Sequence, residues 1–225
     1  KIGVFTNLTG DHLDYHLTME SYAAAKARLF AMLPGDGIAV INADDPASAA
    51  MARGCRARVL NATVTGAAGD ARVRVEVLRS SLDGMTLRLR GPWGSVDAEA
   101  PLIGSYNAMN VAQALAACWA WSPALMGRDL TLDEIAIALG RVSAPPGRLE
   151  PVMTSAANRS RRASAGRGVA PPKVFVDYAH TDDALRNVLE AVRGVIAGPT
   201  KLWAVFGAGG DKDRTKRPRM GAAAS

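Results

Sequence analysis

A stretch of small and basic residues at 155–170 constrains the fold of this chain most, because it cannot belong to a packed core. The stretch is rich in Ser, Ala, Gly and Arg and contains no aromatic residue. Such a composition buries too little apolar surface to offset the conformational entropy that is lost on folding. We therefore expect two domains, 1–150 and 151–225, with a flexible loop at 155–170 near the start of the second.

The first domain combines two kinds of apolar pattern. Residues 37–42 form a continuous apolar run, which suits a parallel strand that is buried on both faces. Three later segments alternate apolar with polar residues and are broken by turn dipeptides, as antiparallel strands are. We therefore predict an α/β domain with a mixed sheet. The expected strands are 1–7, 37–42, one near Val59, 71–78, 84–90 and 95–100. The expected helices are 19–33, 46–53, 107–121 and 132–139, the last opened by the capping-box pair Thr131 and Glu134.

A new pattern starts after the loop. Strand-like segments at 174–178 and 202–206 flank a helical pattern over 182–196. The order strand, helix, strand predicts a crossover between parallel strands, and hence a second domain with a parallel sheet.

The net charge of +6 does not indicate nucleic-acid binding, because much of the excess lies in 155–170 without aromatic residues that could stack on bases. No run approaches the roughly 18 apolar residues that a membrane span needs. Cys55 and Cys118 match neither a disulfide framework nor a metal-binding spacing. We expect a monomeric, cytoplasmic protein that binds neither nucleic acid nor membranes.

Lys26 is the most informative single residue, because it lies on the apolar face of its predicted helix. Its neighbours at helical spacing are Tyr22, Ala23, Leu29 and Phe30. Most lysines in such a position extend their amine to water. A lysine that stays in apolar surroundings needs a partner or a chemical role. The pattern alone leaves both interpretations open.

Two polar segments follow predicted strands, where open α/β sheets place their ligands. Residues 11–16, Asp-His-Leu-Asp-Tyr-His, bring together two carboxylates and two of the three histidines, which fits a metal site and a polar surface turn equally well. Residues 177–180, Asp-Tyr-Ala-His, precede Thr181, which has the position of a helix N-cap. The second segment fits both an anion site and a well-capped helix with a structural histidine.

Six segments in a fixed order resemble the Mur ligase family, and most closely its type that adds the third amino acid to a cell-wall precursor. The resemblance covers most of the chain. It implies part of a central ATP-binding domain, without that domain's phosphate-binding loop, followed by the start of a Rossmann-like, amino-acid-binding C-terminal domain. The segments are 6–9 with 11–16, 22–26, 104–110, 147–150, 176–181 and 206–218.

The resemblance implies an ATP- and Mg²⁺-dependent ligase that joins diaminopimelate or lysine to the small-molecule substrate UDP-MurNAc-L-Ala-D-Glu through an acyl phosphate. It also implies a role for each matching residue. Lys26, carbamylated and catalytic, would bind Mg²⁺ together with His12; Asn107 and Asn110 would lie at the adenine, Arg148 and the catalytic His180 near the phosphates, Asp177 at the ribose hydroxyls, and Lys212 at the carboxylate of the incoming amino acid.

The chain departs from the family at several positions. Gly10, Leu17 and Asp182 replace the usual residues, and Leu17 stands where the family has a glycine. Lys212 replaces an arginine, which keeps the charge but loses the two-pronged geometry. Both ends of the sequence interrupt expected elements, so we expect a fragment that alone binds ATP poorly and is inactive. The alternatives are another Mur or folylpolyglutamate-type ligase, and a non-catalytic nucleotide-binding relative.

Overall fold

The computed structural model separates into two compact units, Lys1–Val142 and Ser143–Ser225. Residues 143–150, which we expected in the first domain, therefore belong to the second unit. The described residues are 1–9, 16–66, 69, 71–152, 172–196, 198–209 and 216–225.

The first unit is built on a six-stranded sheet in the order β1-β2-β3-β4-β5-β6. The first four strands pair in parallel and the last two pairings are antiparallel, which confirms the predicted mixed α/β sheet. The change in direction comes at β4, where the sequence changes from continuous apolar runs to alternation. The strands are β1 (Ile2–Phe5), β2 (Ile38–Asn42), β3 (Arg58–Thr63), β4 (Val73–Ser81), β5 (Gly84–Gly91) and β6 (Gly94–Ala100).

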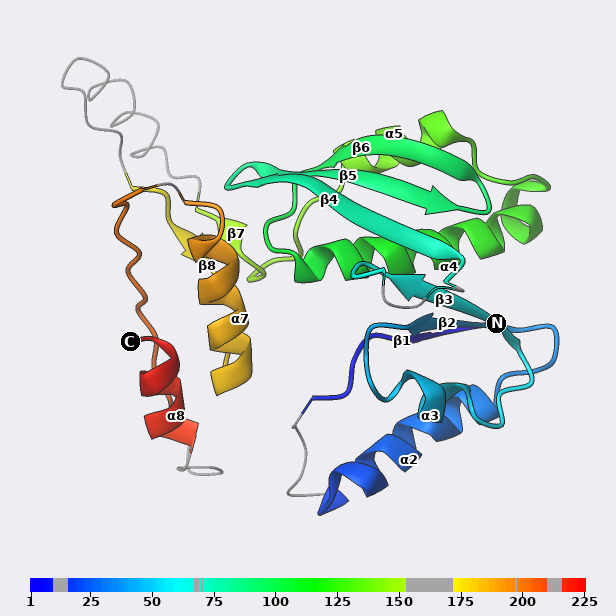
Figure 1. Cartoon of the computed structure of the whole chain (residues 1–225), viewed down its shortest axis with the longest axis horizontal. Helices are drawn as coiled ribbons and strands as arrows, with labels where there is room; N and C mark the ends of the chain where they lie inside the picture. The colour runs from blue at the N-terminus through cyan, green and yellow to red at the C-terminus, as the bar shows by residue number, and fades with distance from the viewer. Residues whose placement is uncertain (10–15, 67–68, 70, 153–171, 197, 210–215) are drawn as a thin grey trace. The chain divides into compact units, whose positions relative to one another are not determined.

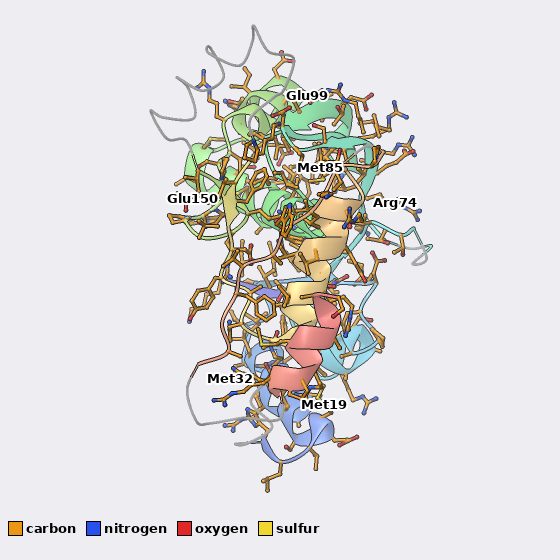
Figure 2. The ribbon with its side chains drawn as sticks, turned by 90° about the vertical axis from the view of Figure 1, so that its left-hand side faces the viewer. Met19, Met32, Arg74, Met85, Glu99 and Glu150 are labelled. Carbon is orange, nitrogen blue, oxygen red and sulfur yellow. The ribbon has the colours of Figure 1, made fainter. Side chains whose placement is uncertain are left out.

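Helices cover both faces of the parallel strands (Figure 1). On one face, α2 (Met19–Ala31) and α3 (Ser48–Ala52) enclose a core that includes Phe5, Phe30 and Met51. Figure 2 labels Met19, the first residue of α2, and Met32, the C-cap residue that follows its last. On the other face lies α4 (Tyr106–Met126), whose buried residues include Val111 and Leu115. The parallel strands therefore lie between two layers of helices.

The helix α5 (Leu132–Gly140) packs against β6 and begins with the predicted capping box. The Thr131 hydroxyl accepts a hydrogen bond from the Glu134 amide, and the Glu134 carboxylate accepts one from the Thr131 amide. Arg128 also donates to this carboxylate at 2.6 and 2.9 Å. The hydrogen bonds from Arg128, and then that from the Thr131 amide, lower the pKa of Glu134 to about 2.

The described residues of the second unit form two short strands and two helices. β7 (Glu150–Pro151) pairs antiparallel with β8 (Phe175–Val176). α7 (Asp182–Arg193) and α8 (Lys216–Ala223) pack together, and Arg219 forms an ion pair with Asp182 at 3.3 Å. The buried apolar side chains of the second unit, among the described residues, are Leu149, Leu185, Val192 and Met220.

The predicted parallel crossover of the second domain is wrong for the described residues. Residues 202–206 form no strand, and β8 pairs only with β7, in the antiparallel sense. A strand of a parallel sheet needs helices over both of its faces. Trp203 is 81% exposed and Val205 is 100% exposed, so no described layer covers this apolar run.

Two smaller expectations also change. Leu29, predicted on the apolar face of α2, is 53% exposed, because the helix buries Phe30 and each step rotates the side chain by about 100°. Cys118 is exposed rather than part of a core, and both it and Cys55 are free thiols. No helix in the described part of the chain has the length and apolar character that crossing a membrane requires.

Candidate functional site

Lys26, the candidate site lysine of the first unit, lies against an aromatic ring. Lys26 Nζ lies 4.9 Å from the centre of the Tyr22 ring, one helical turn earlier, and the Tyr22 ring stacks on His16 at 4.9 Å. Thr18 caps the helix by accepting a hydrogen bond from the Ser21 amide. The half-buried Lys26 ammonium is therefore held by a cation–π contact at the amino-terminal part of α2.

Polar residues at the end of β2 fasten the chain where it leaves β1. The side-chain amide of Asn42 donates a hydrogen bond to the Thr6 carbonyl at 2.7 Å, and the backbone amide of Leu8 donates one to the Asp45 carboxylate at 2.9 Å. Asp45 also accepts a hydrogen bond from the Ala47 amide at 2.8 Å. These contacts fix residues 6–8 at the carboxyl edge of the sheet, the edge at which open α/β sheets bind ligands.

Asp44 anchors the end of β3 in the same way. It accepts hydrogen bonds from the Thr63 hydroxyl at 2.5 Å, the Val64 amide at 2.8 Å and the Thr65 amide at 3.1 Å. Burial raises the pKa of Asp44, but these hydrogen bonds outweigh it and leave the pKa below its ordinary value. Sequence reasoning missed Asn42, Asp44 and Asp45, although their place at the end of an apolar run was a usable signal.

The two predicted asparagines lie together on the first turn of α4. The Asn107 side-chain amide donates to the Ile103 carbonyl at 2.8 Å, and that of Asn110 donates to Asn107 Oδ1 at 3.0 Å. Gly104, at φ 94°, provides the backbone conformation that starts this turn. Asn107 is thus fixed in orientation, while the exposed Asn110 keeps its carbonyl oxygen and a second N–H for a ligand.

In the second unit, Asp177 holds a tight turn in place. One of its oxygens accepts a hydrogen bond from the Leu149 amide and the other accepts one from the Ala179 amide, both at 2.8 Å. The turn contains two residues at positive φ, Gly147 at 68° and Leu149 at 48°. It is also closed by Glu150, which accepts a hydrogen bond from the Gly147 amide at 2.7 Å. The Asp177 carboxylate therefore has a structural function whatever else it binds.

Arg148 and His180 approach the same tyrosine. The Arg148 guanidinium lies 5.0 Å from the centre of the Tyr178 ring, and the His180 ring lies 5.0 Å from it in an edge-on arrangement. His180 Nδ1 contacts the Tyr178 carbonyl at 3.1 Å, which leaves Nε2 for another partner. Tyr178 was not predicted as a site residue, and its place between Asp177 and His180 was the signal for it.

The amino terminus of α7 lies beside this group. Thr181 caps the helix through a hydrogen bond from the Ala184 amide at 3.2 Å, as predicted. Lys216 Nζ donates to the His180 carbonyl at 3.4 Å. The structure therefore brings together Arg148, Asp177 and His180, and separately Asn107 and Asn110.

Two predicted residues, His12 and Lys212, lie outside the described residues. Within the described ranges, no three His, Cys, Asp or Glu side chains gather closely enough to hold a metal ion. The metal site that the resemblance implies therefore stays a prediction, with Lys26 as its described member.

The fold and these local sites define a class: α/β proteins in which a mixed-sheet domain, with helices over its parallel strands, precedes a second unit that contains the capped helix α7. Residues 1–118 match the Mur ligase middle domain, and residues 161–225 match the glutamate ligase domain of Mur ligases. The chain belongs to the Mur ligase family.

Named relatives are similar over the whole chain. A UDP-N-acetylmuramoyl-L-alanyl-D-glutamate--2,6-diaminopimelate ligase from Parasynechococcus marenigrum (strain WH8102) is 41% identical over 227 residues, which cover 99% of this chain and 41% of the relative. A ligase of the same name from Neisseria meningitidis (serogroup A, strain Z2491) is 39% identical over 226 residues, which cover 100% of this chain and 42% of that relative. The chain thus spans less than half the length of these relatives.

Solved structures agree with this assignment. The structure of a UDP-N-acetylmuramoyl-L-alanyl-D-glutamate--2,6-diaminopimelate ligase matches with a TM-score of 0.66 at 34% identity, covering 100% of this chain and 41% of that chain. A crystal structure of MurF from Acinetobacter baumannii matches with a TM-score of 0.65 at 17% identity, covering 84% of this chain and 36% of that chain. The second likeness concerns the fold alone.

Proposed function

We propose that this chain forms the central and C-terminal part of an ATP-dependent ligase that adds 2,6-diaminopimelate to UDP-N-acetylmuramoyl-L-alanyl-D-glutamate. The observation that carries the proposal is the 41% identity, over 99% of the chain, to a ligase of that name. Because the relatives are longer, the complete reaction is assigned to the full-length protein. The substrates are small molecules, and the residues of this chain supply part of their site.

The nucleotide is assigned to two groups of residues. Asn107 and Asn110 offer amide donors and acceptors that suit the edge of an adenine, and the hydrogen bond between them holds both in one orientation. Arg148 and His180 supply the positive charge and the N–H for phosphate oxygens. Asp177 uses one lone pair of each oxygen for the backbone, which leaves lone pairs to accept hydrogen bonds from ribose hydroxyls.

Lys26 fits a magnesium site only after chemical modification. Mg²⁺ takes oxygen ligands, and the unmodified ammonium is a cation that repels it. A carbamate on Nζ turns this position into a carboxylate-like ligand, and because the group is then an anion it gives up the cation–π contact with Tyr22. His12 would be a further ligand. When bound, Mg²⁺ supplies positive charge that offsets the phosphates and the acceptor carboxylate.

Lys212 is assigned to the carboxylate of the incoming amino acid. A lysine provides charge without the bidentate contact that an arginine makes. We therefore expect weaker binding of the amino acid, measured as KM, than an arginine at this position would give.

The test is a ligation assay of the full-length protein with ATP, Mg²⁺ and the muramoyl dipeptide. Diaminopimelate and lysine are supplied together as competing amino acid substrates. We expect ADP release that depends on diaminopimelate and a product whose mass is that of the muramoyl tripeptide. Preferential use of lysine would redirect the proposal to the other amino acid. Absence of ligation with both amino acids would overturn the proposal in favour of a non-catalytic nucleotide-binding relative.

A further inference from the structure

Tyr178 is an exposed aromatic residue of the second unit that contacts both residues assigned to the phosphates. Its side chain is 64% exposed. The Arg148 guanidinium lies over the Tyr178 ring, 5.0 Å from its centre, and the His180 ring lies 5.0 Å from it in an edge-on arrangement. A side chain that is so exposed contributes little to a core, so its contacts with Arg148 and His180 are the ones to explain.

Hydrogen bonds fasten the backbone from which these side chains extend. The Tyr178 amide donates to the carbonyl of Gly147, the residue before Arg148, at 2.7 Å. The Leu149 amide donates to the Asp177 carboxylate at 2.8 Å, which joins the same two segments a second time. The Tyr178 ring and the Arg148 side chain therefore start from neighbouring, fixed points. The direction of the guanidinium is what remains to be set.

The Tyr178 ring restricts Arg148 without occupying its hydrogen-bond donors. A guanidinium over an aromatic ring is held by the cation–π attraction, while the N–H groups in its own plane stay available to phosphate oxygens. Within the described ranges, no carboxylate forms an ion pair with Arg148. An arginine that is already held by the ring loses less conformational freedom when it binds a phosphate.

The backbone of Tyr178 orients His180 as well. A carbonyl oxygen only accepts hydrogen bonds, so His180 Nδ1, which lies 3.1 Å from the Tyr178 carbonyl, is the donor in this contact. Nε2 is then the nitrogen left for a phosphate oxygen, to which it donates when the ring is doubly protonated. Because this contact uses the backbone, a substitution of the Tyr178 side chain tests the ring alone.

We propose that Tyr178 is a positioning residue for the phosphates of ATP, acting on Arg148 through its ring and on His180 through its carbonyl. The inference rests on the proposed function, since it takes Arg148 and His180 as the residues that bind the phosphates. The adenine and the ribose are assigned to other residues. Loss of the Tyr178 ring should therefore weaken the binding of ATP and leave the binding of adenosine unchanged.

The test measures the dissociation constants of ATP with Mg²⁺ and of adenosine by titration calorimetry. It uses the full-length protein without the other substrates, so that no ligation occurs. Tyr178→Leu removes the ring and is expected to weaken ATP binding roughly twofold to fivefold, the range that one cation–π contact at an exposed site supports. Tyr178→Phe keeps the ring and is the matched control, which should bind ATP as the parent protein does. Unchanged adenosine binding in both variants shows that they are folded.

A double-mutant cycle tests whether Tyr178 acts through Arg148. In an Arg148→Gln background, Tyr178→Leu should change the affinity for ATP by less than about 1.5-fold, because the guanidinium that the ring holds is absent. A full effect of Tyr178→Leu in that background would overturn the proposal. Equal weakening of ATP and adenosine binding, or equal weakening by the Leu and Phe variants, would also overturn it.

Two further outcomes separate this inference from the proposed function. Unchanged ATP binding in Tyr178→Leu, together with weakened ATP binding in Arg148→Gln, would overturn the role of Tyr178 alone. Unchanged ATP binding in Arg148→Gln would overturn the assignment of the phosphates, and the role of Tyr178 with it.

Discussion

Leu17 occupies a backbone conformation that suits glycine. Its φ is 65°, and its side chain is 81% exposed. A left-handed conformation costs a residue with a Cβ about 1–2 kcal/mol. A glycine, which the resemblance to the Mur ligase family implies at this position, would adopt this conformation without that cost.

Replacing Leu17 with glycine is therefore expected to stabilise the chain by about 0.5–1 kcal/mol, the relief of strain less the added entropy of an unfolded glycine. Urea unfolding of the 225-residue chain measures the change. Leu149 is the matched control, since its φ of 48° is also positive but its side chain is only 4% exposed. Leu149→Gly should destabilise, because buried apolar surface is lost. A destabilised Leu17→Gly variant would show that strain at this position is negligible.

Lys26 is the residue on which the proposed metal site depends. In the full-length protein, Lys26→Ala should lower turnover by roughly 10²–10³-fold, the usual effect of removing one electrostatic stabiliser. Short carboxylates such as acetate should restore part of the activity, because they replace the missing anion. Lys26→Arg is the control that keeps the positive charge but cannot form a carbamate, and it should be equally impaired. Unchanged turnover in Lys26→Ala would rule out the metal role.

At the scale of elements, the α5 capping box connects stability to pH. The folded-state pKa of Glu134, about 2, lies below the ordinary value of 4.5, mainly because Arg128 donates hydrogen bonds to the carboxylate. A depressed carboxylate pKa contributes stability that is complete above the ordinary value and is lost as pH falls through the folded value.

The free energy of unfolding should therefore decrease between about pH 4.5 and about pH 2, and part of this decrease should be absent in Glu134→Gln. Denaturant unfolding across that interval is the measurement. Arg128→Gln should reduce the dependence partly, since the contacts with Thr131 remain. A Glu134→Gln variant with the pH profile of the parent chain would contradict the assignment.

The elements with a local signal could be predicted from the sequence. Alternation of apolar and polar residues predicts β4, β5 and β6, because it gives each strand one buried face. The pair Thr131 and Glu134 predicts the start of α5, because the two residues cap it. Residues 202–206 could not be predicted in this way, because an apolar run becomes a strand only when other elements cover it.

At the scale of the whole molecule, the two units differ in the size of their cores. The first unit surrounds a six-stranded sheet, whereas the described part of the second buries four apolar side chains. We expect two unfolding transitions by calorimetry, with the second unit unfolding at the lower temperature.

Matched core substitutions assign the transitions. Leu185→Ala removes a side chain of the second unit that is 6% exposed, at a cost of about 2–5 kcal/mol, and should lower the midpoint of the low-temperature transition only. Leu89→Ala, at a fully buried position of the first unit, should lower the midpoint of the high-temperature transition only. A single transition that both variants shift equally would contradict the independence of the units.

The sequence motifs named individual candidate residues, but not how the fold groups them. The motifs pointed to Arg148, Asp177 and His180, which the fold brings into one group around Tyr178. The structural function of Asp177 could not be seen in the sequence, because it depends on the turn at 147–150, which is distant along the chain.

The proposed reaction begins with activation of a carboxylate by ATP, and isotope transfer tests this step directly. The full-length protein is given ATP, diaminopimelate and the muramoyl dipeptide labelled with ¹⁸O in its glutamate carboxylates, and the released phosphate is analysed by mass spectrometry. If the carboxylate takes up the phosphoryl group before the amide forms, one labelled oxygen leaves with each phosphate. Release of unlabelled phosphate during amide formation would contradict an acyl phosphate intermediate.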